Sequence, residues 1–496
     1  MSVTDTPGEV LDPALEARGT ELRSAEQGRL FRTVWRWHFY AGLLVIPVLV
    51  ILCLSGIVYL FKPQIDAIAY GNLRDVTPSA SGTTVSYDRQ RDAAQRYLGD
   101  EGLVLGMTPL AARDRATEFE AFDADGRDVT VYVNPYSGKV TGSRDDGATL
   151  TALALELHGT LLSARLFDDE GKWGDRVIEL AASWTVVVLI TGMYLWWPRG
   201  RKRSWRTAMQ RPRGGRDRRT FWRDLHATTA VLFSFVFLFF LLTGLAWTGV
   251  WGERATSFAT DRSLSYPAGT YDGAASKTIE DITQGRPAAW SMGKLPVLRS
   301  PSADGDRTLR WNPADGAPLD AIVGQAESMG LADGYVVSFP EDSAGAYTLT
   351  AMPDGDAQPN VKATDQRVTY IDQYTAEPIS DYEYAEFGIY AKTMDLGIAL
   401  HEGRQFGLVN QLLTLTATLA LLLTMATSVV MWRKRRPRGI GAPRRPADRR
   451  LGIGVLAITA GLGVFLPLLG LSLIALILLD LLVIRRIPPL RRALGA

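Results

Sequence analysis

The chain of 496 residues contains only four histidines, and all four stand beside long apolar segments. His38 in "VWRWH" and His226 in "FWRDLH" each follow a Trp-Arg pair and open an apolar run. His158 in "LELHGTLL" and His401 in "IALHEGRQ" each precede an apolar run. Imidazole is a common protein ligand of iron, copper and zinc. Four histidines in these places could form two metal-binding pairs.

The apolar runs are long enough to cross a membrane. The mean hydropathy of +0.01 in a chain with 22% charged residues indicates apolar blocks that alternate with polar ones. A span needs about 20 apolar residues. Runs of sufficient length lie at 39–61, 177–197, 228–250 and 408–432. A fifth stretch, 451–484, is interrupted by Pro467 and Gly470, so we interpret it as a hairpin of two shorter helices.

Arginine-rich segments set the orientation of these spans. Basic residues precede the first run, fill "PRGRKRSWRTAMQRPRGGRDRR" and "RKRRPRGIGAPRRPADRR", and recur at the C-terminus. Basic flanks mark the cytoplasmic side, and with six spans all four segments face that side. We therefore expect a multi-pass protein of the cytoplasmic (inner) membrane with both termini in the cytoplasm. The arginines sit against span ends, so we expect the lipid bilayer rather than nucleic acid as their partner.

Two long connections lie outside in this topology and have the pattern of small α+β domains. In the first, "RQRDAAQRYLG" predicts a helix, and "TEFEAFDADGRDVTVYVNPYSGKVTG" predicts strands with turns at "DADG" and "NPYSG". In the second, "LDAIVGQAESMG" predicts a helix. Further strands are expected at "GYVVSFP", "AYTLTAM" and "RVTYIDQYTAEPIS".

The chain contains an internal repeat. "VYVNPYSGKV" aligns with "TYIDQYTAEP", "VWRWHFYAGLLV" with "FWRDLHATTAVL", and "LELHGTLL" with "IALHEGRQ". The alignment pairs Asn134 with Asp372 and Tyr136 with Tyr374, and it places Ala376 where the first copy has glycine. Each half then holds one inner histidine, one span, one outer domain, one outer histidine and one returning span.

The repeat and the topology place the histidines at two depths. His38 and His226 fall at the cytoplasmic ends of the first and third spans, and His158 and His401 fall on the outer side. Two facing imidazoles between packed helices can hold the iron of a b-type haem. Two such pairs would hold two haems, one per leaflet, which is the minimum needed to pass electrons across a membrane.

Other metal centres are less well supported by the residue types. The single cysteine, Cys53, excludes a cysteine-based zinc site, an iron–sulfur cluster and a C-x-x-C-H haem attachment. A zinc or copper site would need more ligands than the histidine pairs offer, although Glu402 is adjacent to His401.

Arginines and glycines near the histidines suit a haem. Arg36 and Arg223 lie near the inner pair and Arg404 follows His401 by three residues, so these arginines could bind haem propionates. The basic-flank rule accounts equally for the first two. Small residues on the spans could let a helix or a macrocycle approach closely. These residues are Gly56, Gly192 and Gly244.

The chain resembles the PepSY-associated transmembrane helix proteins, also called iron-regulated or PiuB-like membrane proteins. The segments that carry the resemblance are "WRWHFYAGL", "SGIVYLF", "VYVNPYSGKVTG", "LHGTLL", "TGMYLWWPRG" and "FWRDLHATTAVLFSFVFLFFLLTGLAW", within about residues 30–437. The family includes di-haem reductases that release iron from ferric siderophores outside the cytoplasmic membrane. The resemblance implies that His38, His158, His226 and His401 are the haem ligands, and that PepSY domains cover the outer haem.

We therefore expect a di-haem b electron-transfer protein, a membrane oxidoreductase that reduces a ferric siderophore or another metal complex. Electrons would come from a quinol or a cytoplasmic reductase. The alternative is a non-enzymatic sensor whose PepSY-like domains bind a peptide or a protease, without haem. A transporter is disfavoured because the spans carry few interior charges. Haem content separates the first function from the other two.

The expected fold class is an α-helical polytopic membrane protein. It would have a four-helix pseudo-symmetric core, a C-terminal helical hairpin and two extracytoplasmic α+β PepSY-like domains. The expected parts are a disordered cytoplasmic tail (1–27), the first span (28–61), external domain 1 (62–148), the outer histidine segment with the second span (149–198), a basic loop (199–220), the third span (221–251), external domain 2 (252–390), the outer histidine segment with the fourth span (391–432), a basic loop (433–450), the hairpin (451–484) and a cytoplasmic tail (485–496).

Overall fold

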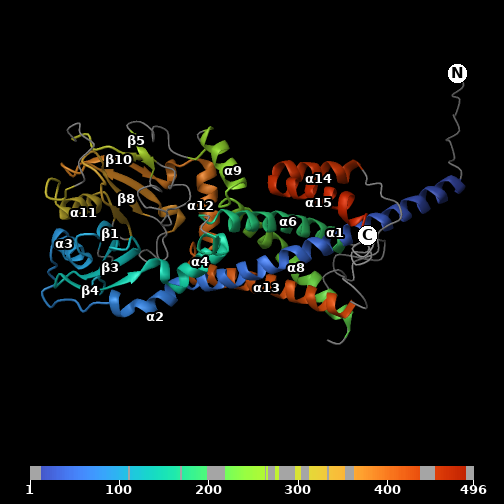
Figure 1. Cartoon of the computed structure of the whole chain (residues 1–496), viewed down its shortest axis with the longest axis horizontal. Helices are drawn as coiled ribbons and strands as arrows, with labels where there is room; N and C mark the ends of the chain where they lie inside the picture. The colour runs from blue at the N-terminus through green and yellow to red at the C-terminus, as the bar shows by residue number, and fades with distance from the viewer. Residues whose placement is uncertain are drawn as a thin grey trace, which may run out of the picture. The chain divides into compact units, whose positions relative to one another are not determined.

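The computed structural model describes most of the chain (Figure 1). The described residues are 13–109, 112–167, 170–197, 218–262, 264–265, 274–278, 296–302, 312–331, 334–351, 362–435 and 453–487. The predicted N-terminal tail up to residue 12, and most of the predicted segments 199–220, 433–450 and 485–496, lie outside them. The chain divides into two compact units. The first comprises Met1–Val50, Glu179–Leu241 and Ala420–Ala496, and the second comprises Ile51–Ile178 and Leu242–Leu419.

Long apolar helices dominate the first unit and continue into the second. They are α1 (Pro13–Leu60), α6 (Lys172–Trp196), α8 (Arg219–Leu245) and α13 (Gly407–Arg435). By length and composition, five described helices could cross a membrane. These are Gly28–Leu60, Lys172–Trp196, Arg219–Leu245, Gly407–Arg435 and Pro467–Ile484. The helical, polytopic character predicted from the sequence is therefore confirmed.

Helix α1 is longer than the first predicted span. It begins at Pro13, so residues 13–27, which we expected to be disordered, are helical. Leucine, alanine, glutamate and arginine recur in this segment, and all four have high helix propensity. Proline is tolerated in the first turn, where its missing N–H is not needed. The polar segment therefore extends the helix of the span instead of forming a separate tail.

The predicted C-terminal hairpin consists of α14 (Ile453–Phe465) and α15 (Pro467–Leu479). The break falls at Leu466, which is extended, and Pro467 begins the second helix. Gly463 and Gly470 allow the helices to touch, since a Cβ added at Gly470 would lie 2.4 Å from the Gly463 carbonyl oxygen. With 13 residues, α14 is shorter than the 20 or so that a span needs, so this first helix of the hairpin, the fifth predicted span, is not among the candidates.

The second unit contains an antiparallel eight-stranded sheet of order β10-β9-β8-β7-β1-β2-β3-β4. The two predicted domains thus share one sheet, joined where β1 pairs with β7 through Gly106 and Ser338. The first half holds β1 (Leu103–Thr108), β2 (Thr117–Phe122), β3 (Asp128–Asn134) and β4 (Lys139–Asp145). The second half holds β7 (Val336–Ser338), β8 (Tyr347–Ala351), β9 (Arg367–Ile371) and β10 (Pro378–Glu383). A separate pair is formed by β5 (Ala274–Thr278) and β6 (Pro296–Leu298).

Two helices pack on the sheet and cap each other. They are the predicted helices, α3 (Tyr87–Leu98) and α11 (Leu319–Ser328), and both contribute to one apolar core with the sheet. The Asp88 carboxylate accepts the backbone N–H of Leu319 at 3.0 Å, and the Asp320 carboxylate accepts that of Tyr87 at 3.1 Å. Each aspartate thus binds an N–H group at the start of the other helix, where helical partners are missing.

The internal repeat is visible in the turns that follow β3 and β9. Asn134 Oδ1 accepts the N–H groups two and three residues ahead at 2.9 and 3.2 Å, and Asp372 Oδ1 does the same at 2.8 and 3.0 Å. The hydroxyls of Tyr136 and Tyr374 each donate to a backbone carbonyl, at 2.7 and 2.6 Å. The pairing of these residues predicted from the sequence is therefore confirmed.

The glycine-to-alanine difference between the turns leads to a stability prediction. Gly138 has φ 62° and Ala376 has φ 59°, a left-handed conformation that costs an L-residue about 1–2 kcal/mol. Ala376→Gly removes this cost but adds about 0.5–1 kcal/mol of backbone entropy. We expect it to raise the unfolding free energy by up to about 1.5 kcal/mol, measured by denaturant unfolding of the solubilised protein. Gly138→Ala should lower it, and the opposite signs would contradict the prediction.

Candidate functional site

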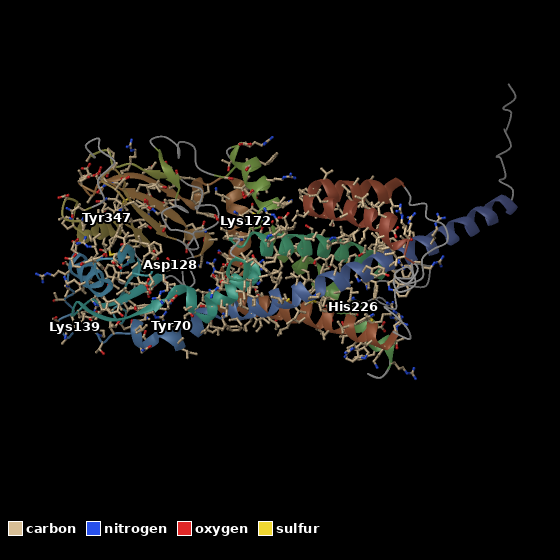
Figure 2. The ribbon with its side chains drawn as sticks, in the orientation of Figure 1. Tyr70, Asp128, Lys139, Lys172, His226 and Tyr347 are labelled. Carbon is tan, nitrogen blue, oxygen red and sulfur yellow. The ribbon has the colours of Figure 1, made fainter. Side chains whose placement is uncertain are left out.

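The structure brings the four histidines together as two pairs, each within one unit. The rings of His38 on α1 and His226 on α8 have centres 6.4 Å apart and planes at 80°. Figure 2 labels His226 on its helix. The rings of His158, on α4 (Leu150–Thr160), and His401, on α12 (Ile389–His401), have centres 6.5 Å apart and planes at 88°. This is the pairing that the repeat predicts.

Equivalent elements of the two halves carry these histidines. His38 and His226 lie on the first long helix of each half. His158 and His401 lie near the ends of short helices that follow the last strand of each half, after the 3₁₀ turns η1 (Asp146–Ala148) and η3 (Tyr384–Glu386). The strand-to-helix connections of the shared sheet therefore position the His158–His401 pair.

A neighbouring helix fixes each ring of the His38–His226 pair. His38 Nδ1 lies 3.1 Å from the Thr191 hydroxyl and 3.1 Å from the backbone carbonyl three residues earlier. His226 Nδ1 lies 3.4 Å from the Thr427 hydroxyl and 2.9 Å from the carbonyl three residues earlier. A carbonyl can only accept, so Nδ1 carries the proton in both rings. Nε2 is then the nitrogen through which each ring would bind a metal.

The His158–His401 pair is held in the same way. His158 Nδ1 lies 3.3 Å from the Ser55 hydroxyl and 2.9 Å from the carbonyl three residues earlier. His401 Nδ1 lies 2.7 Å from the Thr243 hydroxyl. Burial lowers the pKa of His158, and burial together with the neighbouring His158 lowers the pKa of His401 to about 3. Both imidazoles are therefore neutral at physiological pH, as a metal ligand must be.

A small residue follows each hydroxyl and leaves room for the ring. A Cβ added at Gly192 would lie 3.1 Å from His38 Cε1, and one added at Gly56 would lie 3.2 Å from His158 Cε1. At Gly244 the distance to His401 Cε1 would be 4.0 Å. The glycines that we expected to admit a helix or a macrocycle thus lie against the histidine rings themselves.

The sequence interpretation overlooked the hydroxyls that precede these small residues. The same dipeptide type, a hydroxyl residue followed by a small one, occurs opposite all four histidines. The four dipeptides are Ser55-Gly56, Thr191-Gly192, Thr243-Gly244 and Thr427-Ser428. Their repetition on four spans is a signal that could have revealed them.

The ring separations fit two imidazoles on opposite sides of one metal ion. A metal–imidazole bond is about 2.0 Å long, and ring bonds of roughly 1.3–1.4 Å place each nitrogen about 1.1 Å from its ring centre. Twice the sum of these lengths is about 6.2 Å, close to the observed 6.4 and 6.5 Å. Ordinary aromatic packing also covers about 4.5–7 Å. The Nδ1 hydrogen bonds, common to all four rings, are therefore the more specific observation.

Two histidines at each pair are too few for a metal ion bound by protein side chains alone, but they suit a cofactor that supplies further ligands itself. Among the described residues, no group of three or more histidine, cysteine, aspartate or glutamate side chains could hold a metal ion. A protein-only zinc site usually needs three or four ligands. A haem needs only two ligands from the protein, and a pair of histidines would provide them. The residues present at both pairs therefore fit a haem.

Comparison with known protein families assigns the chain to a family. The sequence model of the PepSY-associated TM region matches residues 35–435. The chain belongs to this family. A search of curated proteins found no match. The family region contains all four histidines and excludes the α14–α15 hairpin, which is an addition to it. Together with the apolar helices, membership shows a multi-pass membrane protein.

The three arginines that we predicted to be propionate ligands contact local side chains in this family member. The Arg36 guanidinium lies 5.0 Å from the centre of the Tyr40 ring. Arg223 pairs with Asp224 at 2.7 Å, and its side chain is 58% exposed. Arg404 donates from Nε to Glu402 at 2.7 Å. Glu402, which we considered as a further metal ligand, is thus engaged by arginine.

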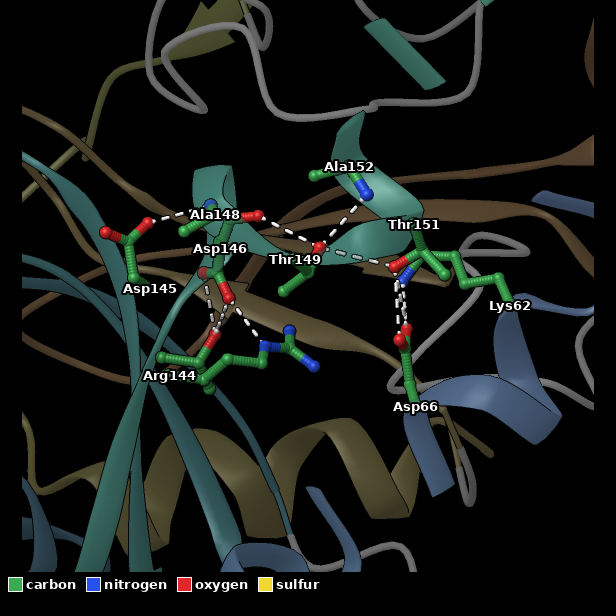
Figure 3. Close-up of polar contacts among 10 residues, drawn as sticks. Lys62, Asp66, Arg144, Asp145, Asp146, Ala148, Thr149, Thr151 and Ala152 are labelled. Atoms are coloured by element: carbon green, nitrogen blue, oxygen red, sulfur yellow. Dashed lines mark hydrogen bonds and ion pairs between the residues drawn. The ribbon is translucent and has the colours of Figure 1, made fainter. Parts of the chain in front are cut away.

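A buried carboxylate anchors the helix that carries His158 (Figure 3). Asp66 of α2 (Lys62–Arg74) is 3% exposed and accepts the Thr151 hydroxyl at 3.1 and 3.3 Å. It also pairs with Lys62 at 3.0 Å. The Thr149 side chain caps the first turn of α4 by accepting the Ala152 N–H at 3.0 Å. The start of α4 is therefore bound to the helix that follows α1.

Removing this carboxylate should loosen α4. Asp66→Ala removes the carboxylate that pairs with Lys62 and accepts the Thr151 hydroxyl, and the loss should cost about 2–3 kcal/mol. Hydrogen–deuterium exchange of residues 150–156 should then be faster. Thr151→Val removes one hydrogen bond and should cost about 1 kcal/mol. Unchanged exchange in Asp66→Ala would contradict the anchoring role.

Proposed function

We propose that the chain is a di-haem b transmembrane electron-transfer protein. It would reduce a ferric siderophore, or another metal complex, on the outer face of the cytoplasmic membrane. The observation that supports the proposal is the presence of two histidine pairs, with ring centres 6.4 and 6.5 Å apart, in which every Nδ1 is hydrogen-bonded to a neighbouring helix.

The residues of this chain would bind and orient the two cofactors. His38 and His226 would hold one haem, and His158 and His401 the other. A bound haem carries one electron at a time through its iron. The backbone carbonyls fix the tautomer of His38, His158 and His226. Hydrogen bonds donated by Nδ1 make Nε2 a better metal ligand.

The direction of transfer follows from the proposed topology. Basic segments at the span ends favour a cytoplasmic location for both termini, with the His38–His226 pair on that side. A quinol or a cytoplasmic reductase would supply electrons, and the complex outside would receive them. Hard oxygen donors bind Fe(III) more tightly than Fe(II), so reduction of the iron weakens its hold in a siderophore.

The deciding experiment is an absorption spectrum of the purified, detergent-solubilised protein, oxidised and dithionite-reduced, with haem quantified per chain. We expect about two b-type haems with low-spin bis-imidazole bands. Oxidation of the reduced protein by a ferric siderophore would then test the acceptor. A colourless protein from cells supplied with haem would overturn the proposal. The haem-free alternative, a sensor that binds a peptide or protease, would then stand.

A further inference from the structure

An arginine that the sequence interpretation did not single out lies against the turn of α1 that carries His38. Arg435 is the last residue of α13, and its guanidinium carbon lies 5.0 Å from the centre of the Trp35 ring and 4.9 Å from that of Phe39. Trp35 and Phe39 lie within one turn of His38 on α1. A cation over aromatic faces is attracted by them and held in place. Arg435 is therefore fixed against the turn of α1 that carries the histidine.

The hydrogen bonding of Arg435 is incomplete. Its Nε is shielded from solvent and has no hydrogen-bond partner among the described residues. A buried donor without an acceptor costs free energy, and more so when it is charged. Arg219, at the start of α8, adds a second positive charge that acts on Arg435. An anion at this place would satisfy the donor and offset the repulsion between the two cations.

We propose that Arg435 binds a carboxylate of the haem held by His38 and His226. The inference rests on the proposed function. A haem carries two propionates, and a guanidinium binds carboxylates through charge-assisted, often bidentate, hydrogen bonds. Arg36 and Arg223, two candidates from the sequence, lie over Tyr40 and against Asp224. Arg435 combines a fixed position on the turn of α1 that carries His38 with a donor that no described residue uses.

The phosphate of an anionic lipid offers similar acceptors, so the experiment must separate the two anions. The variants are Arg435→Gln, which removes the charge, and Arg435→Lys, which keeps the charge but lacks the planar guanidinium that can bind a carboxylate bidentately. Arg433→Gln is the matched control, because Arg433 belongs to the same last turn and is exposed. His226→Ala and His401→Ala supply reference spectra that assign each haem to its pair.

The readouts are the rate at which haem transfers to apomyoglobin and the midpoint potential of each haem. In Arg435→Gln, the haem of the His38–His226 pair should leave at least about tenfold faster, as expected when a charge-assisted hydrogen bond is lost. Its midpoint potential should fall, because a nearby positive charge stabilises the reduced iron. Arg435→Lys should restore most of the potential and part of the retention. The transfer rate and the midpoint potential of the other haem should be unchanged, which would also show that the variant is correctly folded.

Reconstitution with haem dimethyl ester identifies the anion. With its propionates esterified, this haem should leave the wild-type protein and Arg435→Gln at the same rate. Equal haem retention in Arg435→Gln, Arg433→Gln and wild type would overturn the inference while leaving the di-haem function intact. Loss of co-purified lipid phosphorus with haem retention unchanged would assign the site to a lipid phosphate and also overturn it. A wild-type protein without haem would overturn both proposals.

Discussion

Replacement of His226 by alanine should lower the haem content from about two per chain to about one, and replacement of His401 should do the same for the other haem. The reason is geometric. Each ring has one partner, and the two ring centres lie 6.4 or 6.5 Å apart. Removing one ring therefore leaves a single imidazole, which cannot complete bis-histidine ligation. Difference spectra of the purified variants, with haem quantified per chain, measure the loss and identify the haem that remains.

Double variants test whether the pairs act as units. His38→Ala combined with His226→Ala should lose no more haem than either single change, because in the proposed function both residues hold one cofactor. His226→Ala combined with His401→Ala should lose both haems. Loss of both haems, or of neither, in the single His226→Ala variant would show that the histidines do not pair as the structure places them.

The features that the sequence predicted correctly are local or repeated. The turn at Asn134 and its copy at Asp372 depend on side chains that bind N–H groups two and three residues away, so a short segment contains all the information. The candidate spans depend on uninterrupted apolar composition. The four histidines were conspicuous because the chain has no others. Repetition then indicated which of them would meet.

The features that the sequence did not reveal depend on partners far apart in the chain. Thr191 lies 153 residues from the His38 ring that it holds, and no local pattern joins them. The junction of the two half-sheets is a short pairing of β1 with β7 that includes Gly106, which has no side chain to signal it. Arg435 belongs to a basic segment that the orientation rule already explained, so its contact with the aromatic rings of α1 needed the structure.

Leucine in place of Gly192 should selectively weaken the binding of a haem by the His38–His226 pair. Leucine in place of Gly56 should weaken the binding of a haem by the His158–His401 pair. A Cβ alone would lie 3.1 or 3.2 Å from the Cε1 atom of the facing histidine, closer than ordinary contact. A leucine side chain extends further and must displace the ring from the line joining the pair. Overpacking of this kind costs about 1–3 kcal/mol, which corresponds to haem binding weaker by about 5- to 150-fold.

The matched control is Gly42→Leu, because Gly42 lies on α1 and a Cβ added there would meet nothing within 4 Å. Haem titration of the apo-protein, with each haem assigned by its difference spectrum, measures the effect. Equal loss in all three variants would indicate general damage to the helices. If Gly56→Leu and Gly192→Leu weakened the same haem, the two glycines would not serve separate sites. Loss of different haems would show that each glycine keeps the space for one ligand ring, because each contacts a histidine of a different pair.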